Sequence, residues 1–173
     1  MKKNNLAVQL YYNDYNIESP NAKSNATQAL VAQLKAEGTQ IDGVGLESHF
    51  IGGSTPSLAA QKTQMASYVA LGVDVVVTEL DVRIPVPPTA AMQAQQKLDY
   101  YNTVAACTQT KGCVGIVVWD FDDTYSWIPG VFAGTGYADL FFQPGGANTP
   151  LVKKDLYDGC LEALTGVAEV SPL

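Results

Sequence analysis

The sequence contains few of the residues that metal, cofactor and nucleic-acid sites use. Its only histidine is His49, and its three cysteines are not clustered, so no second ligand completes a metal site around that histidine. It has 10 Lys and Arg residues against 17 Asp and Glu residues, a formal net charge of -7, and no basic stripe that would neutralise a phosphate backbone. We therefore expect no metal, no cofactor and no nucleic-acid partner.

Long hydrophobic runs are also missing. No segment is long enough to span a bilayer, and the apolar run at 6–10 is too short for the core of a signal peptide. We expect no membrane partner and see no secretion signal in this chain. The chain does have 173 residues, 47% of them hydrophobic, which is enough for a single domain (1–173) with a sizeable core.

Four short apolar runs occur along the chain, at 6–12, 41–46, 73–81 and 114–119. Each ends in polar or aromatic residues and is followed by a helical pattern. Their centres lie 32 to 40 residues apart, which accommodates a strand, a helix and two connections. We interpret them as βα units of an α/β fold, with parallel strands covered on both faces. Active sites of such folds gather at the carboxyl ends of the strands.

Capping residues predict where the intervening helices begin and end. The first should begin at 24 or 25 and end at Gly38, and the second should begin at 54 or 55, with Pro56 in its first turn, and end near Gly72. A third covers about 89–108, and a fourth ends before Gly166. Their apolar stripes should face the strands: Leu30, Val31 and Leu34; Leu58, Met65 and Val69; Leu98, Tyr101 and Ala105; Leu156, Cys160, Leu161 and Leu164.

The run at 73–81 ends in two acidic residues, Glu79 and Asp81. Because strand side chains alternate, both carboxylates should leave the strand on the same side. A β-branched apolar strand that delivers carboxylates to the open end of a sheet indicates a catalytic site. The alternative is a surface glutamate that ends the strand.

Four motifs occur at these strand ends: YYNDYN at 11–16, GVGLESH at 43–49, TELD at 78–81 and VVWD at 117–120. In this order they resemble the later strands of glycoside hydrolase family 10, the retaining endo-β-1,4-xylanases, and most of all its fungal members. The resemblance covers about 6–166. It implies a (β/α)8 TIM-barrel fold, of which this chain supplies about four βα units, strands five to eight, as a partial catalytic domain.

The resemblance implies catalytic roles for three residues. Glu79 matches the nucleophile of a retaining glycosidase, which works with a second carboxyl group about 5 to 5.5 Å away. His49 matches the histidine that hydrogen-bonds this nucleophile, with Asp81 as the partner of the other ring nitrogen. A lone histidine with a purely structural role is the alternative.

The resemblance also implies substrate contacts. Trp119 and Trp127 resemble the tryptophans that wall the glycone side of the cleft, and Asn13 and Tyr15 match residues on the aglycone side. For Trp119, a core aromatic at a strand end is the alternative. Glu47 stands where the family usually has glutamine, and we expect it to contact substrate or share a proton. The expected partner is xylan or a xylo-oligosaccharide.

The acid/base of the family is the glutamate of an Asn-Glu pair on strand four, and this sequence contains no such pair. We therefore expect hydrolysis of internal β-1,4-xylosidic bonds as the encoded chemistry, with negligible activity of this chain alone. Two alternatives stay open, a non-catalytic xylan-binding fragment and an unrelated α/β half-barrel. Unpaired sheet edges predict pairing with a second copy or with an N-terminal barrel half.

Cys107 and Cys113 lie close enough in sequence for a local disulfide, and two buried thiols are the alternative. Cys160 would be unpaired. By family resemblance the protein is expected to be secreted, which favours the disulfide.

Overall fold

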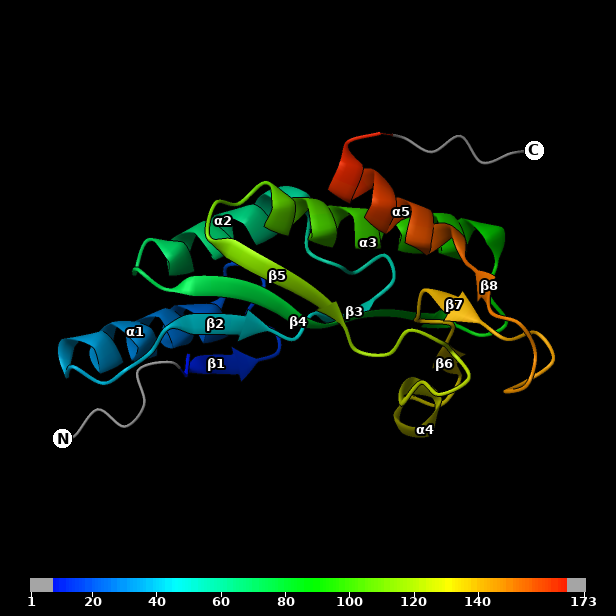
Figure 1. Cartoon of the computed structure of the whole chain (residues 1–173), viewed down its shortest axis with the longest axis horizontal. Helices are drawn as coiled ribbons and strands as arrows, with labels where there is room; N and C mark the ends of the chain where they lie inside the picture. The colour runs from blue at the N-terminus through cyan, green and yellow to red at the C-terminus, as the bar shows by residue number, and fades with distance from the viewer. Residues whose placement is uncertain (1–7, 168–173) are drawn as a thin grey trace.

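The computed structural model describes residues 8–167. Its centre is a parallel sheet with the strand order β1-β2-β4-β5, formed by β1 (Tyr11–Asp14), β2 (Gly43–Leu46), β4 (Asp74–Pro85) and β5 (Cys113–Val118) (Figure 1). β3 (His49–Ile51) extends the pairing along the second half of β4. β1 and β5 are the edges of this parallel group within the described chain, so the barrel does not close there.

Four helices follow the strands: α1 (Ala22–Ala36), α2 (Leu58–Val69), α3 (Ala90–Thr108) and α5 (Asp155–Thr165). Figure 1 shows α2 and α3 along one side of the sheet, with α5 beside α3. Between β5 and α5 lie α4 (Ile128–Val131), β6 (Thr135–Gly136) and the antiparallel pair β7 (Phe141–Phe142) and β8 (Val152–Lys153). None of the helices in the range 8–167 has the length and apolarity needed to cross a membrane.

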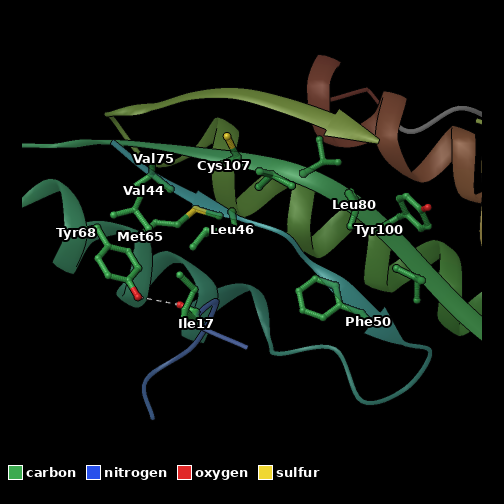
Figure 2. Close-up of a cluster of buried hydrophobic side chains, with 14 of the residues drawn as sticks. Ile17, Val44, Leu46, Phe50, Met65, Tyr68, Val75, Leu80, Tyr100 and Cys107 are labelled. Carbon is green, nitrogen blue, oxygen red and sulfur yellow. Dashed lines mark hydrogen bonds between the residues drawn. The ribbon is translucent and has the colours of Figure 1, made fainter. Parts of the chain in front are cut away.

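The hydrophobic core fills the space between the sheet and the helices (Figure 2). Strand residues of β2 and β4 meet side chains of α2 and α3, and the Tyr68 hydroxyl donates a hydrogen bond of 3.2 Å to the carbonyl of Ile17. Burying such side chains is the main stabilising contribution to a domain of this size. Labelled members of this core are Val44, Leu46, Phe50, Met65, Val75, Leu80, Tyr100 and Cys107.

β4 changes which residues face the helices halfway along its length. Val75 and Val77 are buried in the core in its first half, whereas Leu80 and Val82 are buried in its second half. The register between β4 and β5 shifts between Val77 and Leu80, so strict alternation is interrupted at Thr78 and Glu79. This irregularity keeps Leu80 in the core while Glu79 lies on the opposite face.

The four predicted strands are present with different bounds. The first begins at Tyr11 rather than at 6, and of its predicted residues 6 and 7 lie outside the described range. The strand predicted to end at Asp81 continues to Pro85, because β3 and β6 pair with its second half. β3, β6, β7 and β8 were not predicted, since runs of two or three residues carry no periodic signal.

Two helix starts differ from the prediction. The N-cap of α1 is Asn21, whose side chain accepts from the Ser24 amide while the Ser24 hydroxyl accepts from the Asn21 amide. Both residue types cap helices well, so the sequence pointed to the wrong member of this reciprocal pair. The N-cap of α2 is Ser57, which leaves Pro56 before the helix. The start of α3, with Thr89 as N-cap, and the end of α5 at Gly166 are confirmed.

The expectation that both faces of the strands are covered was wrong for the described residues. Helices cover one face only, and on the edge strand β5 Val117, which lies between the core-packed Ile116 and Val118, is 53% exposed. Leu98 and Leu164, predicted as core-facing, are also exposed. α3 instead buries polar residues such as Gln96, whose side-chain amide donates to the carbonyls of Val82 and Tyr137. Hydrophobicity alone could not identify that face.

Cys107 and Cys113 form a disulfide, as predicted. It joins the end of α3 to the start of β5 and closes a loop with a sequence separation of 6 residues. Cys160 on α5 is a free thiol, and burial raises its pKa to about 12. Cys160 is therefore protonated at neutral pH and unreactive as a nucleophile.

Candidate active site

Five of the predicted site residues meet where β1, β2, β3 and β4 lie side by side. Asn13 lies in β1, Glu47 follows β2, His49 begins β3, and Glu79 and Asp81 lie in β4. The side chain of Asp81 is 1% exposed, and those of His49, Glu79 and Glu47 are 14%, 18% and 21% exposed. Four chain segments thus place three carboxyl groups around one imidazole in a partly buried position.

The carboxylate of Glu79 receives two hydrogen bonds. The Asn13 amide nitrogen donates to Oε1 at 2.9 Å, and His49 Nε2 lies 3.2 Å from Oε2. The hydroxyl of Thr78 donates to the amide oxygen of Asn13 at 2.7 Å, which fixes the orientation of that amide. Gly45 makes this possible, because a Cβ there would lie 2.2 Å from Asn13 Oδ1. Both oxygens of Glu79 are therefore held in defined positions.

His49 bridges the two carboxylates of β4. Its Nδ1 lies 2.8 Å from Asp81 Oδ2, opposite the contact of Nε2 with Glu79. Burial disfavours the charged imidazolium, but the hydrogen bond and charge of Asp81, followed by those of Glu79, outweigh it and raise the pKa of His49. The arrangement favours an imidazolium that donates to both carboxylates.

The turn before His49 is held by two hydrogen bonds that Ser48 donates. Ser48 has φ 64°, in the left-handed region that non-glycine residues rarely adopt. Its amide donates to Oε1 of the buried Glu18 at 2.9 Å, and its hydroxyl donates to the carbonyl of Leu46. This turn directs Glu47 and His49 into the same space, and no sequence pattern predicted it.

Asp81 is shared between His49 and an indole. Trp127 Nε1 donates to Asp81 Oδ2 at 2.9 Å, so the same oxygen receives the histidine and the tryptophan. The ring of Trp127 lies 5.0 Å from that of His49 at an interplanar angle of 64°. The loop that carries Trp127 is thereby tied to β4 and to the carboxylate cluster.

Glu47 approaches the cluster without a short hydrogen bond to it. Its Oε2 lies 3.9 Å from His49 Nε2, and burial followed by the charge of Glu79 raises its pKa. One ligand atom each from Glu47, His49 and Glu79 lies within 4.8 Å of the others. Both ring nitrogens of His49 already contact carboxylates, so we assign no metal to this group.

Aromatic side chains form the walls of the site. Trp119 is 51% exposed and meets His49 edge-on at 6.3 Å, and Tyr15 is 54% exposed. A cavity of about 410 Å³ lies between Tyr15 and Trp127 and is also lined by Glu47 and His49. Trp119 is therefore not a core residue, and the cavity is of a size that accommodates small ligands.

Several residues around the site were not predicted from the sequence. Thr78 orients Asn13, Glu18 fixes the turn at Ser48, and Phe132 packs against Trp127 with ring centroids 5.5 Å apart. Arg83 lies over the Phe132 ring at 3.9 Å. Arg83 lies two residues after Asp81, so strand alternation would have placed it on the same face as Asp81. The predicted strand ended at Asp81, and Arg83 was therefore not considered.

The fold and the site define an incomplete parallel α/β barrel that carries a carboxylate cluster at the carboxyl ends of its strands. The family model described as glycosyl hydrolase family 10 matches residues 2–161, and the chain belongs to this family.

Curated relatives include endo-1,4-beta-xylanase D of Talaromyces funiculosus, 59% identical over 131 residues, or 76% of this chain and 32% of the relative. Endo-1,4-beta-xylanase A of Phanerodontia chrysosporium is 44% identical over 152 residues, or 88% of this chain and 35% of the relative. The chain thus spans about a third of the length of these relatives.

Solved structures give the same result. The chain superposes on a xylanase from Bispora sp. MEY-1, solved with xylobiose, with a TM-score of 0.89 and 67% identity, over 90% of this chain and 46% of that one. For Penicillium canescens endo-1,4-beta-xylanase XylE the TM-score is 0.85 at 52% identity, over 92% and 47%. The predicted fold class is confirmed: the described residues form part of a TIM barrel, with four parallel βα units.

Proposed function

We propose that this chain is one part of an endo-1,4-β-xylanase catalytic domain, with about 6–166 forming that part. Glu79 is the nucleophile in the retaining hydrolysis of internal β-1,4-xylosidic bonds of xylan. The observation that carries the proposal is the carboxylate of Glu79, held by donors on both oxygens, one of which, His49, lines a cavity walled by aromatic side chains.

In this reaction one oxygen of Glu79 attacks the anomeric carbon and forms a glycosyl ester, while the bond to the leaving oxygen breaks. Water then attacks the same carbon and releases Glu79. The hydrogen bonds from Asn13 and His49 keep the carboxylate in one orientation for both steps. Asp81 acts through His49, whose Nδ1 it holds, and is a positioning residue.

The aromatic residues supply the surfaces on which sugar rings lie. Trp119 and Trp127 both lie against the ring of His49, and Tyr15 lines the cavity together with Trp127. From the family resemblance we assign the two tryptophans to glycone sugars and Tyr15 to aglycone sugars. Asn13 and Glu47 contact sugar hydroxyls near the scissile bond. We further propose that Glu47 shares a proton with the neighbouring His49 and Glu79, because its raised pKa favours the protonated form.

Glu47 is not assigned as the acid/base, although one of its carboxyl oxygens lies within 4.8 Å of a ring nitrogen of His49 and of a carboxyl oxygen of Glu79. It follows β2, the strand directly beside β4, so both carboxyl groups approach the sugar from the same side. A retaining enzyme needs its acid on the leaving oxygen. We therefore expect this chain by itself to hydrolyse xylan negligibly.

The test uses a xyloside with an activated leaving group, which needs no acid catalyst to form the glycosyl ester. A 2-fluoro-substituted xyloside slows the release step, and mass spectrometry then detects the accumulated adduct. We expect one adduct, on the peptide that contains Glu79, and none in Glu79→Gln, since removing a nucleophile costs on the order of 10³-fold or more in rate.

The control is Glu162→Gln, which alters a carboxylate paired with Lys97 on the helical side of the molecule. This variant should form the adduct as the wild type does. An adduct on another residue, or one that survives in Glu79→Gln, would contradict the assignment of the nucleophile. Rapid hydrolysis of xylan by the wild-type chain would contradict the expected inactivity.

A non-catalytic xylan-binding fragment is the second candidate, favoured by the exposure of Trp119 and Tyr15. Retention on insoluble xylan distinguishes the two. A binding fragment loses retention in Trp119→Ala and keeps it in Glu79→Ala, without forming an adduct in the preceding experiment. A fragment with the proposed chemistry forms the adduct as well.

The edges of the sheet suggest a macromolecular partner. β1 pairs only with β2, and among the parallel strands of the described chain β5 pairs only with β4. Exposed edges and the uncovered Val114 and Val117 favour docking of a second copy or of an N-terminal barrel half. Light scattering should show a dimer or a poorly folded chain, whereas a well-folded monomer of 18.4 kDa would contradict this. The disulfide supports an extracellular location.

A further inference from the structure

Arg83 carries its charge into the cleft from the same strand as the proposed nucleophile. It lies in the second half of β4, after the change of alternation, and therefore shares a face with Glu79 and Asp81. Its guanidinium carbon lies 3.9 Å from the centroid of the Phe132 ring, which supports one face of the planar group. The edges of the guanidinium, where its N–H groups lie, are not covered by this stacking.

Two adjoining cavities meet at Arg83. One, of about 410 Å³, contains Glu47 and Trp127, and the other, of about 450 Å³, contains Ser19 and Ser54. Both are lined by Arg83 and also by Asn16 and His49. The second cavity thus branches from the first at these three shared residues. It is lined by polar side chains, including the carboxyl group of Glu18, and by the apolar Phe50, Ile51 and Pro56.

The guanidinium of Arg83 makes no hydrogen bond or ion pair with residues 8–167, although it carries five N–H donors. The nearby carboxylates of Glu79 and Asp81 are instead held by His49, with Asn13 and Trp127. Among the residues described, no other arginine or lysine lines either cavity. The chain as a whole has a net charge of -7, so an unpaired cation here is available to an acidic ligand.

We propose that Arg83 binds the carboxylate of a uronic-acid substituent carried on the xylan backbone. This inference rests on the proposed function, because it places the backbone in front of Glu79 and its substituent in the branching cavity. A planar guanidinium forms two parallel hydrogen bonds to a carboxylate, and the Phe132 ring holds that plane. A neutral xylose chain offers no group that would compensate this charge.

The experiment measures binding to the full chain by calorimetry. The ligands are xylotriose, the same trisaccharide with one glucuronic-acid substituent, and free glucuronate. We expect the acidic oligosaccharide to bind about tenfold more tightly than xylotriose in low salt, as for a charge-assisted pair of about 1.4 kcal/mol. Free glucuronate should bind more weakly than either oligosaccharide. The advantage should shrink at about 1 M salt, where the Debye length falls to about 3 Å.

Three variants test whether Arg83 causes the tighter binding of the acidic oligosaccharide. Arg83→Gln should remove the advantage and leave the affinity for xylotriose unchanged within about twofold, a change of about 0.4 kcal/mol. Arg83→Lys should keep part of the advantage, because lysine retains the positive charge but cannot form the two parallel hydrogen bonds of a guanidinium. Lys62→Gln is the matched control, since it removes one positive charge at a side chain hydrogen-bonded to Gln109, away from both cavities.

Each outcome has a defined consequence. Equal affinity of the wild type for both oligosaccharides overturns the role of Arg83 and leaves the proposed function in place. An advantage that persists in Arg83→Gln overturns it as well, because another group then recognises the acid. Tight binding of free glucuronate alone shows an anion site unrelated to xylan. If neither oligosaccharide binds, the proposed function fails together with this inference.

Discussion

Two groups of buried and half-buried carboxylates in this molecule are stabilised in different ways. In the cleft cluster, formed by Glu79, Asp81 and His49, both carboxylates accept hydrogen bonds from neighbouring side chains. In the loop cluster, formed by Asp123, Asp139 and Lys154, Lys154 bonds Asp123 at 2.6 Å. Asp139 is fully buried, and neither of its carboxyl oxygens accepts a hydrogen bond within the described part of the chain.

The difference appears in the protonation of the two clusters. Burial, followed by the charge of Asp123, raises the pKa of Asp139 to about 7. In the cleft cluster it is the pKa of His49 that rises, because its ring lies between the carboxylates of Asp81 and Glu79. Hydrogen-bond donors on both oxygens of Glu79 thus hold it in one orientation, whereas the carboxyl group of Asp139, buried beside another carboxyl group, favours its protonated form. The following predictions test this contrast, from the largest expected effect to the smallest.

Lys154→Met should have the largest effect. The lysine side chain is 2% exposed, and its removal leaves the carboxylate of Asp123 without its cation. Breaking a buried pair in this way costs about 3 kcal/mol of unfolding free energy, measured by urea denaturation at pH 7. Lys62→Met, at a partly exposed lysine bonded to Gln109, should change stability by less than about 0.5 kcal/mol. Equal stability of the two variants would show that Asp123 is solvated.

Asp139→Asn should change the pH dependence of stability. The pKa of Asp139 is about 7 in the folded chain and has a reference value of 3.8. Between these values the folded state binds more protons than the unfolded state, so stability falls as pH rises from about 4 to 7. Asparagine cannot ionise, and at pH 8 the variant should be more stable than the wild type by about 2 kcal/mol. If the unfolding free energies of the wild type and Asp139→Asn change in parallel from pH 4 to 8, the raised pKa of Asp139 is refuted.

Asp81→Asn should lower the pKa of His49, because Asp81 supplies the larger share of the attraction that raises it. His49 is the only histidine, so its ring resonances can be followed through a pH titration without ambiguity. The raised pKa stabilises the fold at low pH and that contribution is lost as pH rises through it. The variant should lose stability by about 1 kcal/mol below that point. Glu162→Gln should leave the histidine titration unchanged, and an unchanged titration in Asp81→Asn would contradict the bridge.

Asn13→Ala should have the smallest effect on stability, below about 1 kcal/mol, because it removes one partly solvated hydrogen bond to Glu79. Its effect on the formation of the glycosyl adduct should be larger than on stability, since the carboxylate loses one of two orienting contacts. Thermal unfolding and the rate of adduct formation separate these effects. Thr78→Val, which removes only the contact that orients Asn13, should lie between the wild type and Asn13→Ala in rate.

Much of the framework follows from local patterns. Apolar runs predicted the four parallel strands, and Thr89 and Gly166 predicted helix ends because each supplies a specific cap. The cysteines close to each other in sequence are bonded. The prediction failed for the faces of α3 and α5, where Leu98 and Leu164 are exposed, because neighbouring elements rather than the helix itself decide which side is covered.

The sequence by itself determined the order of the βα units and the residues available for chemistry, since both depend on composition and spacing along the chain. Only the tertiary structure decided which of those residues meet. The register shift at Thr78 and Glu79, the left-handed turn at Ser48 and the stacking of Arg83 on Phe132 each arise from contacts between distant segments. No local pattern encodes such contacts, because their geometry is set by how the strands pair and how the loops pack over them.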